Sequence, residues 1–275
     1  MGGIAWSMPP TVFGWGAFVK IELSKQAFYE AWKHFQLGAK PLVINVLPDG
    51  VLQSERREAE ERAWEELRAL GFGDRDREDD VHGLLLPLHR YERAFDITYR
   101  YRTPDGDEES LSGLVANVRT AATMAVRTDT SVRLQALPAD SMVRALLSVL
   151  PEVQAGPGRG VSLRSAQMAA AAHGAGASNR AMAEGLVRQG VRRDDARAIV
   201  EMAGEPRIAF AQVGAAAMDG LGNRTRAGMV TNFFATAKGW YVIEENRRTG
   251  EPWTTVAPVD KERMASRVQD LLKAL

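Results

Sequence analysis

Histidine is the residue best suited to metal binding and proton transfer in this chain, and it occurs only four times. The four positions are His34, His82, His89 and His173. Helical metal sites place two ligands three or four residues apart, and no pair of these histidines has that spacing. The sequence has no cysteine, which excludes disulfides, thiolate-ligated zinc, iron–sulfur clusters and thiol nucleophiles. We therefore expect packed or solvated histidines, and we predict no metal and no cofactor.

Two segments resemble ligand-binding loops but lack essential residues. The acidic run from Asp74 to Asp80 resembles a calcium loop, yet Asp79 stands where the sharp turn needs glycine and Leu85 where a bidentate Glu is needed. We expect an exposed loop between helices there. The glycine-rich segment Gly156–Gly160 could cradle an anion, but it lacks the Gly-Lys-Ser/Thr ending of a P-loop, and Val161 breaks the dinucleotide-binding pattern.

Nucleophilic catalysis also finds no support, because neither a Gly-x-Ser-x-Gly elbow nor a Ser-x-x-Lys motif occurs. Nothing in the sequence assembles an acid, a base and an electrophile. The sequence therefore favours a binding protein over an enzyme, and we predict no catalytic residue.

Composition narrows the class of partner. The chain has 275 residues, 45% of them apolar, with 35 Lys and Arg against 35 Asp and Glu. Zero formal charge argues against duplex nucleic acid or an anionic membrane as the main partner, because these select a basic surface. The charge is unevenly spread, with −4 over residues 1–137 and +4 over residues 138–275. We therefore expect a molecule with a modest charge dipole.

The first nineteen residues are uncharged but do not read as an export signal. Prolines and glycines interrupt the apolar stretch, and no basic residue precedes it. No other segment approaches the roughly 20 continuous apolar residues that cross a bilayer. We expect a flexible start, no membrane insertion and a cytoplasmic location.

The elements that would position a binding surface are predicted from periodicity and capping. In the first part of the chain we expect a strand at Phe18–Leu23, a helix capped by Ser24, an extended run at Pro41–Leu47, and a helix capped by Ser54 and ended by Gly71. Alternation then predicts a meander with strands at residues 94–102, from 111, at 121–127 and at 131–137.

The second half repeats this plan. After a linker at residues 151–160 we expect an Ala-rich segment at 165–172, a helix capped by Ser178 and another ended by Gly204. Four strands follow, at about 207–217, 225–234, 239–245 and 253–257. Pro138 and Pro258 each open a helix after the last strand of a meander. The pattern predicts two similar halves, 1–150 and 151–275, related by a pseudo-twofold axis.

Several moderate motifs, in order, resemble the EspG family, the cytosolic chaperones associated with ESX (type VII) secretion in mycobacteria and related actinobacteria. The resemblance covers nearly the whole chain. It rests on Pro41–Leu47 with Asp49-Gly50 and Ser54–Glu58, Gly156–Leu163, Gly190-Val191 with Asp194–Arg197, Gln212–Ala216, Phe233-Phe234 with Lys238–Val242, and Gly250–Pro258.

This resemblance implies an α+β fold, with two similar halves around a central antiparallel β-sheet flanked by two α-helical bundles, as one compact unit. It also implies a function. The family's members bind the helical tip of the PPE protein in a PE/PPE heterodimer, keep it soluble and direct the dimer to its secretion system. Such docking needs buried apolar anchors with a polar rim and no catalytic group. Beyond this partner the sequence leaves only weak self-association as a further option.

The chain departs from the family's pattern at three positions. Ala235 follows the Phe-Phe pair where Asp is expected, and Trp240 follows glycine where Arg is expected. The two changes could replace an ion pair by apolar packing, or could alter partner preference. Pro87 interrupts a segment expected to be helical and should kink or end it.

Three regions are expected to contact the partner. In relatives the loop at residues 102–110 helps to grip the PPE protein; here it is acidic, and a solvated hairpin turn is an equal alternative. Residues on the second meander could face the partner or the core, and the helices at 178–203 offer a basic face that includes Arg193 and Arg197. The predicted protein-binding residues are Asp105, Asp107, Glu108, Glu109, Gln212, Asn232, Phe234, Arg188 and Arg192.

Two alternative functions stay open at this point. One is a small-ligand-binding protein or enzyme with a pocket at the pseudo-symmetry interface, where dispersed residues such as His89 and Asp260 could meet. The other is a chaperone for a different type VII substrate, such as a small helical-hairpin dimer.

Overall fold

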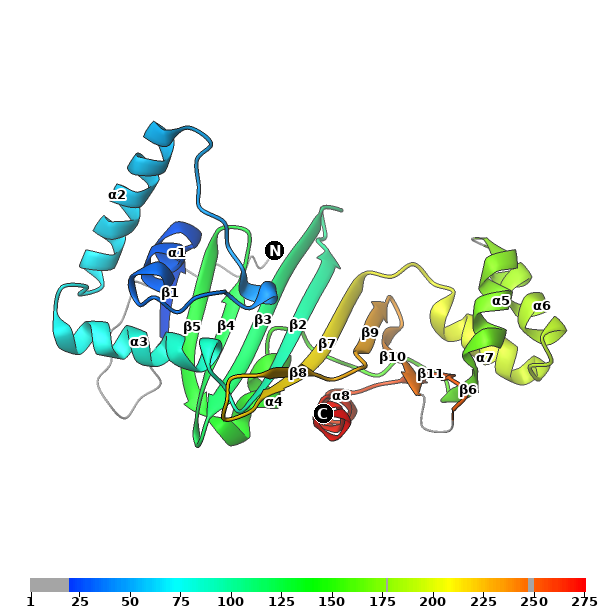
Figure 1. Ribbon diagram of the computed structural model, residues 1–275. Helices are drawn as coiled ribbons and strands as arrows, with labels where there is room; N and C mark the ends of the chain where they lie inside the picture. Colours follow the sequence, from blue (N-terminus) through cyan, green and yellow to red (C-terminus); the bar gives the residue numbers. More distant parts are fainter. Residues whose placement is uncertain (1–19, 177, 247–249) are drawn as a thin grey trace. The chain divides into compact units, whose positions relative to one another are not determined.

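The structure is a computed structural model that describes residues 20–176, 178–246 and 250–275 (Figure 1). Three sequence predictions touch other residues. The flexible start at residues 1–19 and the first two residues of the strand expected at Phe18–Leu23 lie outside the described residues, as do Arg248 and Thr249 in the turn expected between the strands at 239–245 and 253–257.

The described residues form helices and antiparallel strands, which confirms the predicted α+β class with a large antiparallel sheet. Contacts divide the chain into two compact units. Of the described residues, the first unit holds 20–96, 111–146 and 217–224, and the second holds 97–110, 147–176, 178–216, 225–246 and 250–275. The halves 1–150 and 151–275 stay a prediction, because a division by contacts does not test whether they repeat one plan.

The first unit contains three long helices and the strand order β1-β5-β4-β3-β2, of which β2 contributes its first residues. Its elements are β1 (Lys20–Ser24), α1 (Lys25–His34), η1 (Leu42–Ile44), α2 (Gln53–Ala69), α3 (Arg75–His89), β2 (Arg93–Arg102), β3 (Glu108–Val118), β4 (Ala121–Arg127), β5 (Ser131–Pro138), η2 (Ala139–Ser141) and α4 (Met142–Leu147). Helix α1 packs on α2, and α3 packs on β4 and β5.

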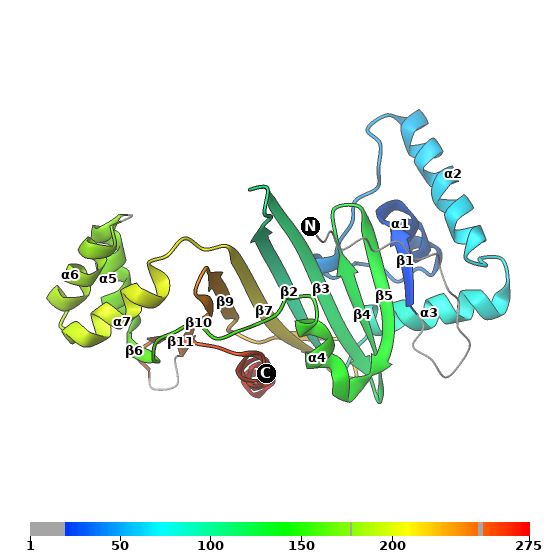
Figure 2. The ribbon, with the colours of Figure 1, turned by 180° about the vertical axis from the view of Figure 1, so that it is seen from behind.

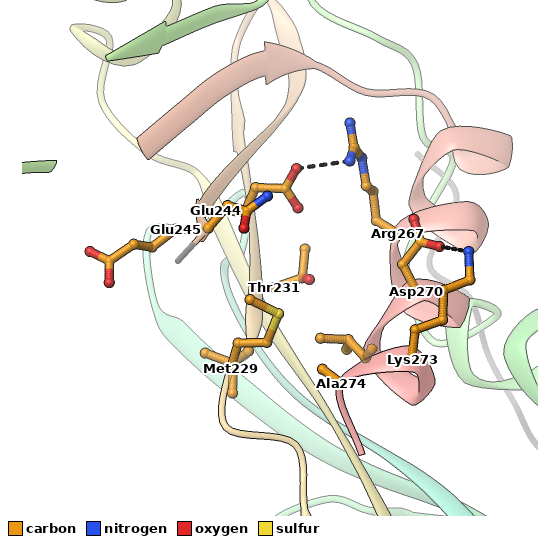
Figure 3. Close-up of a pocket in the computed structure, with 11 residues that line it drawn as sticks. Met229, Thr231, Glu244, Glu245, Arg267, Asp270, Lys273 and Ala274 are labelled. Atoms are coloured by element: carbon orange, nitrogen blue, oxygen red, sulfur yellow. Dashed lines mark hydrogen bonds and ion pairs between the residues drawn. The ribbon is translucent and has the colours of Figure 1, made fainter. Parts of the chain in front are cut away.

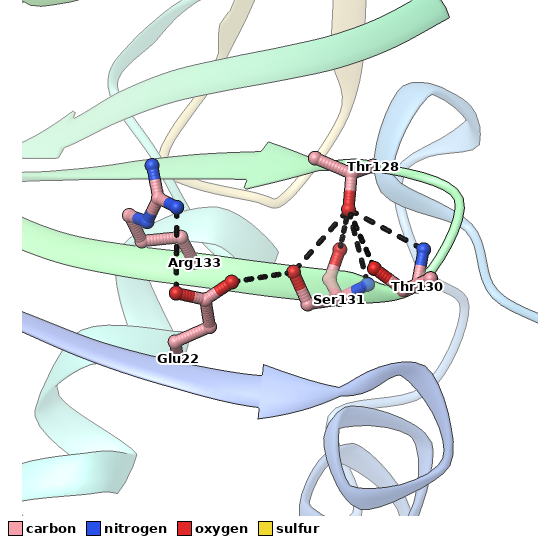
Figure 4. A network of polar contacts seen from close by, with 5 residues as sticks. All are labelled: Glu22, Thr128, Thr130, Ser131 and Arg133. Carbon is pink, nitrogen blue, oxygen red and sulfur yellow. Dashed lines mark hydrogen bonds and ion pairs between the residues drawn. The ribbon is translucent and has the colours of Figure 1, made fainter. Parts of the chain in front are cut away.

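Local chemistry explains how this unit starts. The Ser24 hydroxyl accepts a hydrogen bond from the Ala27 amide and caps α1, as predicted. Strand β1 pairs antiparallel with β5, and a polar network lies across this pair (Figure 4). Glu22 accepts hydrogen bonds from the Ser131 hydroxyl at 2.7 Å and from Arg133 at 3.3 Å. The Ser131 hydroxyl bond is the main cause of the lowered pKa of Glu22.

The extended run predicted at Pro41–Leu47 is wrong. The chain makes a 3-10 turn at Leu42–Ile44 instead, in which the Ile44 amide donates to the Pro41 carbonyl at 3.1 Å. Pro41, Ile44 and Val46 are buried, whereas Leu42 and Leu47 are exposed, so the run does not form a regular half-buried strand.

The start of α2 also differs from the prediction. The helix begins at Gln53, one residue before the expected Ser54 cap. Glu55 takes the capping role, because its carboxylate accepts from the Val51 and Leu52 amides at 2.9 and 3.0 Å. Gly71, with φ of 97°, follows the end of the helix as predicted.

The acidic run expected to form a loop belongs to α3. Asp74 caps this helix by accepting from the Asp76 amide, and the next acidic residues occupy the first turns, where the helix dipole favours negative charge. Pro87 is buried inside α3, and the helix continues to His89 before it ends. A proline this close to the end removes few helical hydrogen bonds, which is why the helix tolerates it.

The second unit has the strand order β2-β7-β9-β10-β11-β6, with β8 pairing on β7 (Figures 1 and 2). Its elements are β6 (Val161–Arg164), α5 (Ser165–Ala175), α6 (Asn179–Arg188), α7 (Arg193–Ala203), β7 (Ala209–Met218), β8 (Arg224–Arg226), β9 (Thr231–Thr236), β10 (Gly239–Asn246), β11 (Trp253–Pro258), α8 (Lys261–Asp270) and η3 (Leu271–Ala274). Ser178 caps α6, as expected, and the helix predicted to open after Pro258 is α8, which Asp260 caps. The strand predicted at 225–234 is two strands, β8 and β9, because a loop with Gly228 separates them.

Alternation along the strands gives this sheet two different faces. Helices α5 and α7 pack on β6 and β11, and their apolar residues form one buried cluster with Phe234, Tyr241 and Val256. Trp240 and Glu244 point to the opposite face, where Arg267 of α8 lies 3.1 Å from the Glu244 carboxylate. Each face is therefore covered over part of its area by helices.

The segment predicted as a linker at residues 151–160 packs closely against β10. The Gly156 amide donates to the Trp240 carbonyl at 3.2 Å, and the Tyr241 hydroxyl donates to the Pro157 carbonyl. A Cβ at Gly156 would lie 2.2 Å from the Tyr241 side chain. The lack of a side chain at Gly156 thus allows this part of the chain to pack closely on β10. We call residues 156–160 the glycine strap.

Candidate protein-binding face

One part of the second unit's sheet carries side chains that the neighbouring helices leave exposed or only partly buried. We define the open face as Arg100 of β2, Phe210 and Gln212 of β7, Asn232 of β9 and Ile243 of β10. The strand register aligns Phe210 with Phe234 and Tyr241, and Gln212 with Asn232 and Ile243. Arg100 and Gln212 are exposed, and the other three are partly buried. The open face thus combines apolar and polar groups next to the α5–α7 cluster.

The two amides at its centre are hydrogen-bonded to each other. Gln212 Nε2 donates to Asn232 Oδ1 at 2.9 Å. Each amide keeps further donor and acceptor capacity, because a carboxamide can form up to four hydrogen bonds. The sequence predicts both residues as contacts, and the structure brings them together on adjacent strands. Their contact with a partner stays a prediction.

Phe234 is in the core and not on the surface. It is 0% exposed, stacks on Tyr241 with 5.4 Å between ring centroids, and has the Arg207 guanidinium 4.9 Å from its own centroid. Burial raises the pKa of Tyr241 above its ordinary value. Of the two alternatives that the sequence leaves open for Phe234, the structure shows the one in which it faces the core, beside Phe210 of the open face.

The acidic loop is a tight hairpin whose carboxylates point to both faces of the sheet. Asp105 and Asp107 are exposed in the turn. Glu108 lies 3.8 Å from Arg102, whereas Glu109 accepts a hydrogen bond from the Tyr101 hydroxyl. Arg102 and Tyr101 are neighbours on β2, so their side chains point in opposite directions. Only Glu108 therefore lies on the side of the open face.

Arg188 and Arg192 are exposed on the helical bundle. Arg188 is the last residue of α6, and Arg192 directly precedes α7. Neither has an ion-pair partner in the part of the chain that the structure describes, whereas Arg197 pairs with Glu201 at 2.7 Å. No hydrogen bond or ion pair among the described residues joins them to the open face, so their role as contacts stays a prediction.

Sequence reasoning misses a pocket beside the open face. Its volume is about 160 Å³, and it lies between the end of β2 and the start of β7. Its lining residues are Arg100, Tyr101, Arg102, Glu108, Arg207, Ile208, Ala209 and Phe210. The arginines at 100 and 102 alternate with tyrosines at 99 and 101, a signal that places both arginines on one face. Residues 207–210, which also line the pocket, are about a hundred positions away in the sequence, and no sequence pattern indicates that they join it.

A second hollow, of about 430 Å³, lies between α8 and the ends of β9 and β10 (Figure 3). Four of its charged side chains are already paired, Arg267 with Glu244 at 3.1 Å and Lys273 with Asp270 at 2.6 Å. A ligand would have to compete with these ion pairs for each charge, so nothing here favours a charged small molecule.

The residues suggested for a catalytic pocket have local structural roles. His89 lies edge-on to Trp32, and burial with nearby arginines lowers its pKa. Asp260 caps α8 by accepting from the Arg263 amide at 2.8 Å. Over residues 20–176, 178–246 and 250–275, no cluster of three or more His, Asp or Glu residues could hold a metal ion. None of the helices in these ranges is both long and apolar enough to span a bilayer.

Comparison with known proteins adds two findings. The sequence model of the EspG family matches residues 24–270. Among solved structures, the chain is similar to the Mycobacterium tuberculosis type VII secretion system chaperone EspG5, in its complex with the PE25–PPE41 dimer. The TM-score is 0.69 at 13% identity, covering 94% of this chain and 97% of the other, and this likeness shows the fold. No curated protein gives a significant sequence match.

Proposed function

The chain belongs to the EspG family, and from this premise we propose that it is a cytoplasmic chaperone for the PPE protein of a PE/PPE heterodimer. In this role it binds the helical tip of the PPE protein, keeps the dimer soluble and directs it to a type VII secretion system. The binding involves no catalytic step. The similar EspG5 chaperone was solved with the PE25–PPE41 dimer, which supports the same class of partner.

The observation that carries this proposal is the open face itself. Phe210 and Ile243 offer partly buried apolar contact, and the Gln212–Asn232 amides offer hydrogen bonds beside them. A helical tip needs this mixture, because its apolar side chains require contact and the carbonyls at the ends of its helices require donors. The helices α5–α7 bound the face on one side.

Co-expression with PE/PPE pairs from the same genome tests the proposal. A soluble ternary complex in size-exclusion chromatography is the expected result. Asn232→Arg should prevent the complex, because a long charged side chain would occupy the centre of the open face, whereas Glu61→Arg on α2 should leave it intact. Separate elution of the wild-type chain from every native pair would refute the proposed partner class.

Mass spectrometry of proteins that copurify from the native host distinguishes PE/PPE proteins from another type VII substrate as the partner. Recovery of PE and PPE proteins supports the proposal. Recovery of small helical-hairpin dimers without them would assign the chain to a different type VII substrate.

A further inference from the structure

The 160 Å³ pocket beside the open face has an excess of positive charge. Three of its lining residues are arginines and one is a glutamate, Glu108. Glu108 lies 3.8 Å from Arg102, so this acid is engaged by one of the three. Arg100 and Arg207 have no ion-pair partner among the residues that the structure describes. Two guanidinium groups thus face the pocket without a carboxylate.

Aromatic rings hold both of these arginines. The Arg100 guanidinium lies 5.8 Å from the Phe210 ring centroid, and that of Arg207 lies 4.9 Å from the Phe234 centroid. A guanidinium that lies over a ring uses its flat face for the contact and leaves its N–H donors at the edge. These donors are therefore partly pre-ordered before any ligand arrives, which lowers the entropy cost of binding.

We propose that this pocket receives one carboxylate side chain, Asp or Glu, from the helical tip of the partner protein. The inference rests on the proposed function and adds a specificity-determining contact to it. The carboxylate accepts hydrogen bonds from Arg100 and Arg207, a geometry to which the planar guanidinium is suited. Its aliphatic stem lies against Phe210 and Ile208, of which Ile208 is 46% exposed.

Charge and size both select this occupant. Three arginines against one glutamate attract an anion, and a volume of about 160 Å³ suits a single side chain better than a helix. The exposed Asp105 and Asp107 lie in the hairpin turn next to Glu108, and they disfavour a second acid on the partner at that position. A partner without the carboxylate would leave the guanidinium groups partly desolvated and unpaired, which is a source of discrimination.

The test uses the full chain and the PE/PPE dimer that copurifies with it. Affinity is measured by calorimetry or interferometry for wild type, Arg207→Gln and Arg100→Gln at low and at moderate salt. We expect each variant to bind about 10- to 100-fold more weakly at low salt, and with a shallower salt dependence. Arg68→Gln, which removes one exposed charge from α2, is the matched control and should bind as wild type does. Arg207→Lys should bind less tightly than wild type, because lysine keeps the charge but loses the planar fork.

Substitution of each acid at the partner's helical tip by its amide then identifies the occupant. One substitution should be strongly non-additive with Arg207→Gln, because both remove the same contact. Unchanged affinity and salt dependence in both Arg variants would overturn the inference and leave the proposed function standing. The inference would also be overturned if Arg100→Gln lost the binding of inorganic phosphate but bound the dimer with the full affinity of wild type. Failure of the wild-type chain to bind any dimer would instead refute the proposed function.

Discussion

Trp240 lies directly opposite Ala235 across strands β10 and β9, and both side chains are buried. These are the two positions where the family's pattern leads us to expect Arg and Asp. A charged pair would therefore face each other across the two strands, and in this chain an indole over a methyl group fills the same space. The Trp240 ring also lies 6.4 Å from that of Tyr99. Apolar side chains thus occupy a cross-strand site at which the family resemblance leads us to expect an ion pair.

This pair predicts a strong coupling between two substitutions. Ala235→Asp alone should lower the free energy of unfolding by about 3 kcal/mol, because it buries an unpaired charge. Trp240→Arg alone should also destabilise. The double variant should lose about 1–3 kcal/mol less free energy of unfolding than the two single losses added together, since the two charges would face each other. Urea unfolding measures this coupling. Ala209→Asp with Trp240→Arg is the control, because Ala209 pairs with Ala235 and not with Trp240; equal coupling in both cycles would contradict the argument.

The glycine strap predicts a large effect from one methyl group. Gly156→Ala should destabilise the protein by about 2–4 kcal/mol, because the new Cβ would overlap the Tyr241 ring. Gly174→Ala is the opposite case, since Gly174 lies in α5 and a Cβ added there would meet no neighbouring element within 4 Å. It should stabilise by about 0.5–1 kcal/mol through helix propensity. Thermal unfolding compares the two, and a tolerated Gly156→Ala would show that the strap can move away.

The hairpin predicts unequal roles for its two glutamates. Glu108 lies on the side of the open face and Glu109 on the other, where the Tyr101 hydroxyl donates to it. Glu108→Lys should change the association rate with the partner at low salt more than Glu109→Lys does. Reversal of all four acids, Asp105, Asp107, Glu108 and Glu109, should change the association rate in the same direction as Glu108→Lys and by a larger factor. Stopped-flow or interferometry gives the rates, and equal effects of the two single variants would argue against this division of faces.

Glu22 predicts a dependence of stability on pH. Its pKa is lowered in the folded protein, chiefly by the Ser131 hydroxyl and also by Arg133, so the folded state favours the ionised form. This stabilisation is complete above the unfolded pKa and is lost as the pH falls through the lower folded pKa. Glu22→Gln should therefore lower the free energy of unfolding by a few tenths of a kcal/mol at pH 7 and by less near pH 3. The effect is small because the Glu22 side chain is partly exposed. Urea midpoints at the two pH values check this. Glu61→Gln on α2 serves as control, and a Glu22→Gln effect that grows at low pH would reverse the assignment.

Local signals allow much of the fold to be predicted. The caps at Ser24, Ser178 and Asp260 and the strands at 121–127 and 131–137 follow from hydrogen bonding and alternation within a few residues. The sequence does not reveal the four-residue strand β6, because it is too short to show alternation. The acidic residues after Asp74 have the polar composition of a loop but begin a helix, since the Asp74 cap outweighs composition.

The site is harder to predict, for a physical reason. Gln212 and Asn232 lie side by side on the open face, but Phe234, which the sequence also selects, is buried, and its burial depends on Tyr241 and on Arg207 above it. The arginine pocket likewise joins residues about a hundred positions apart. Burial and charge pairing at such a site depend on strand register, which no local pattern encodes.

The interleaving of the two units has a consequence for synthesis on the ribosome. The first unit includes residues 217–224, and the second includes residues 97–110. No single cut in the sequence separates the two units. The first unit lacks residues 217–224 until about four-fifths of these 275 residues have been made. The first unit therefore gains its last segment only after residues 97–110 and 147–216 of the second unit have already been translated. Newly made chains must hold an incomplete first unit while the second emerges, so a chaperone of this design itself passes through a stage in which apolar strands await their partners.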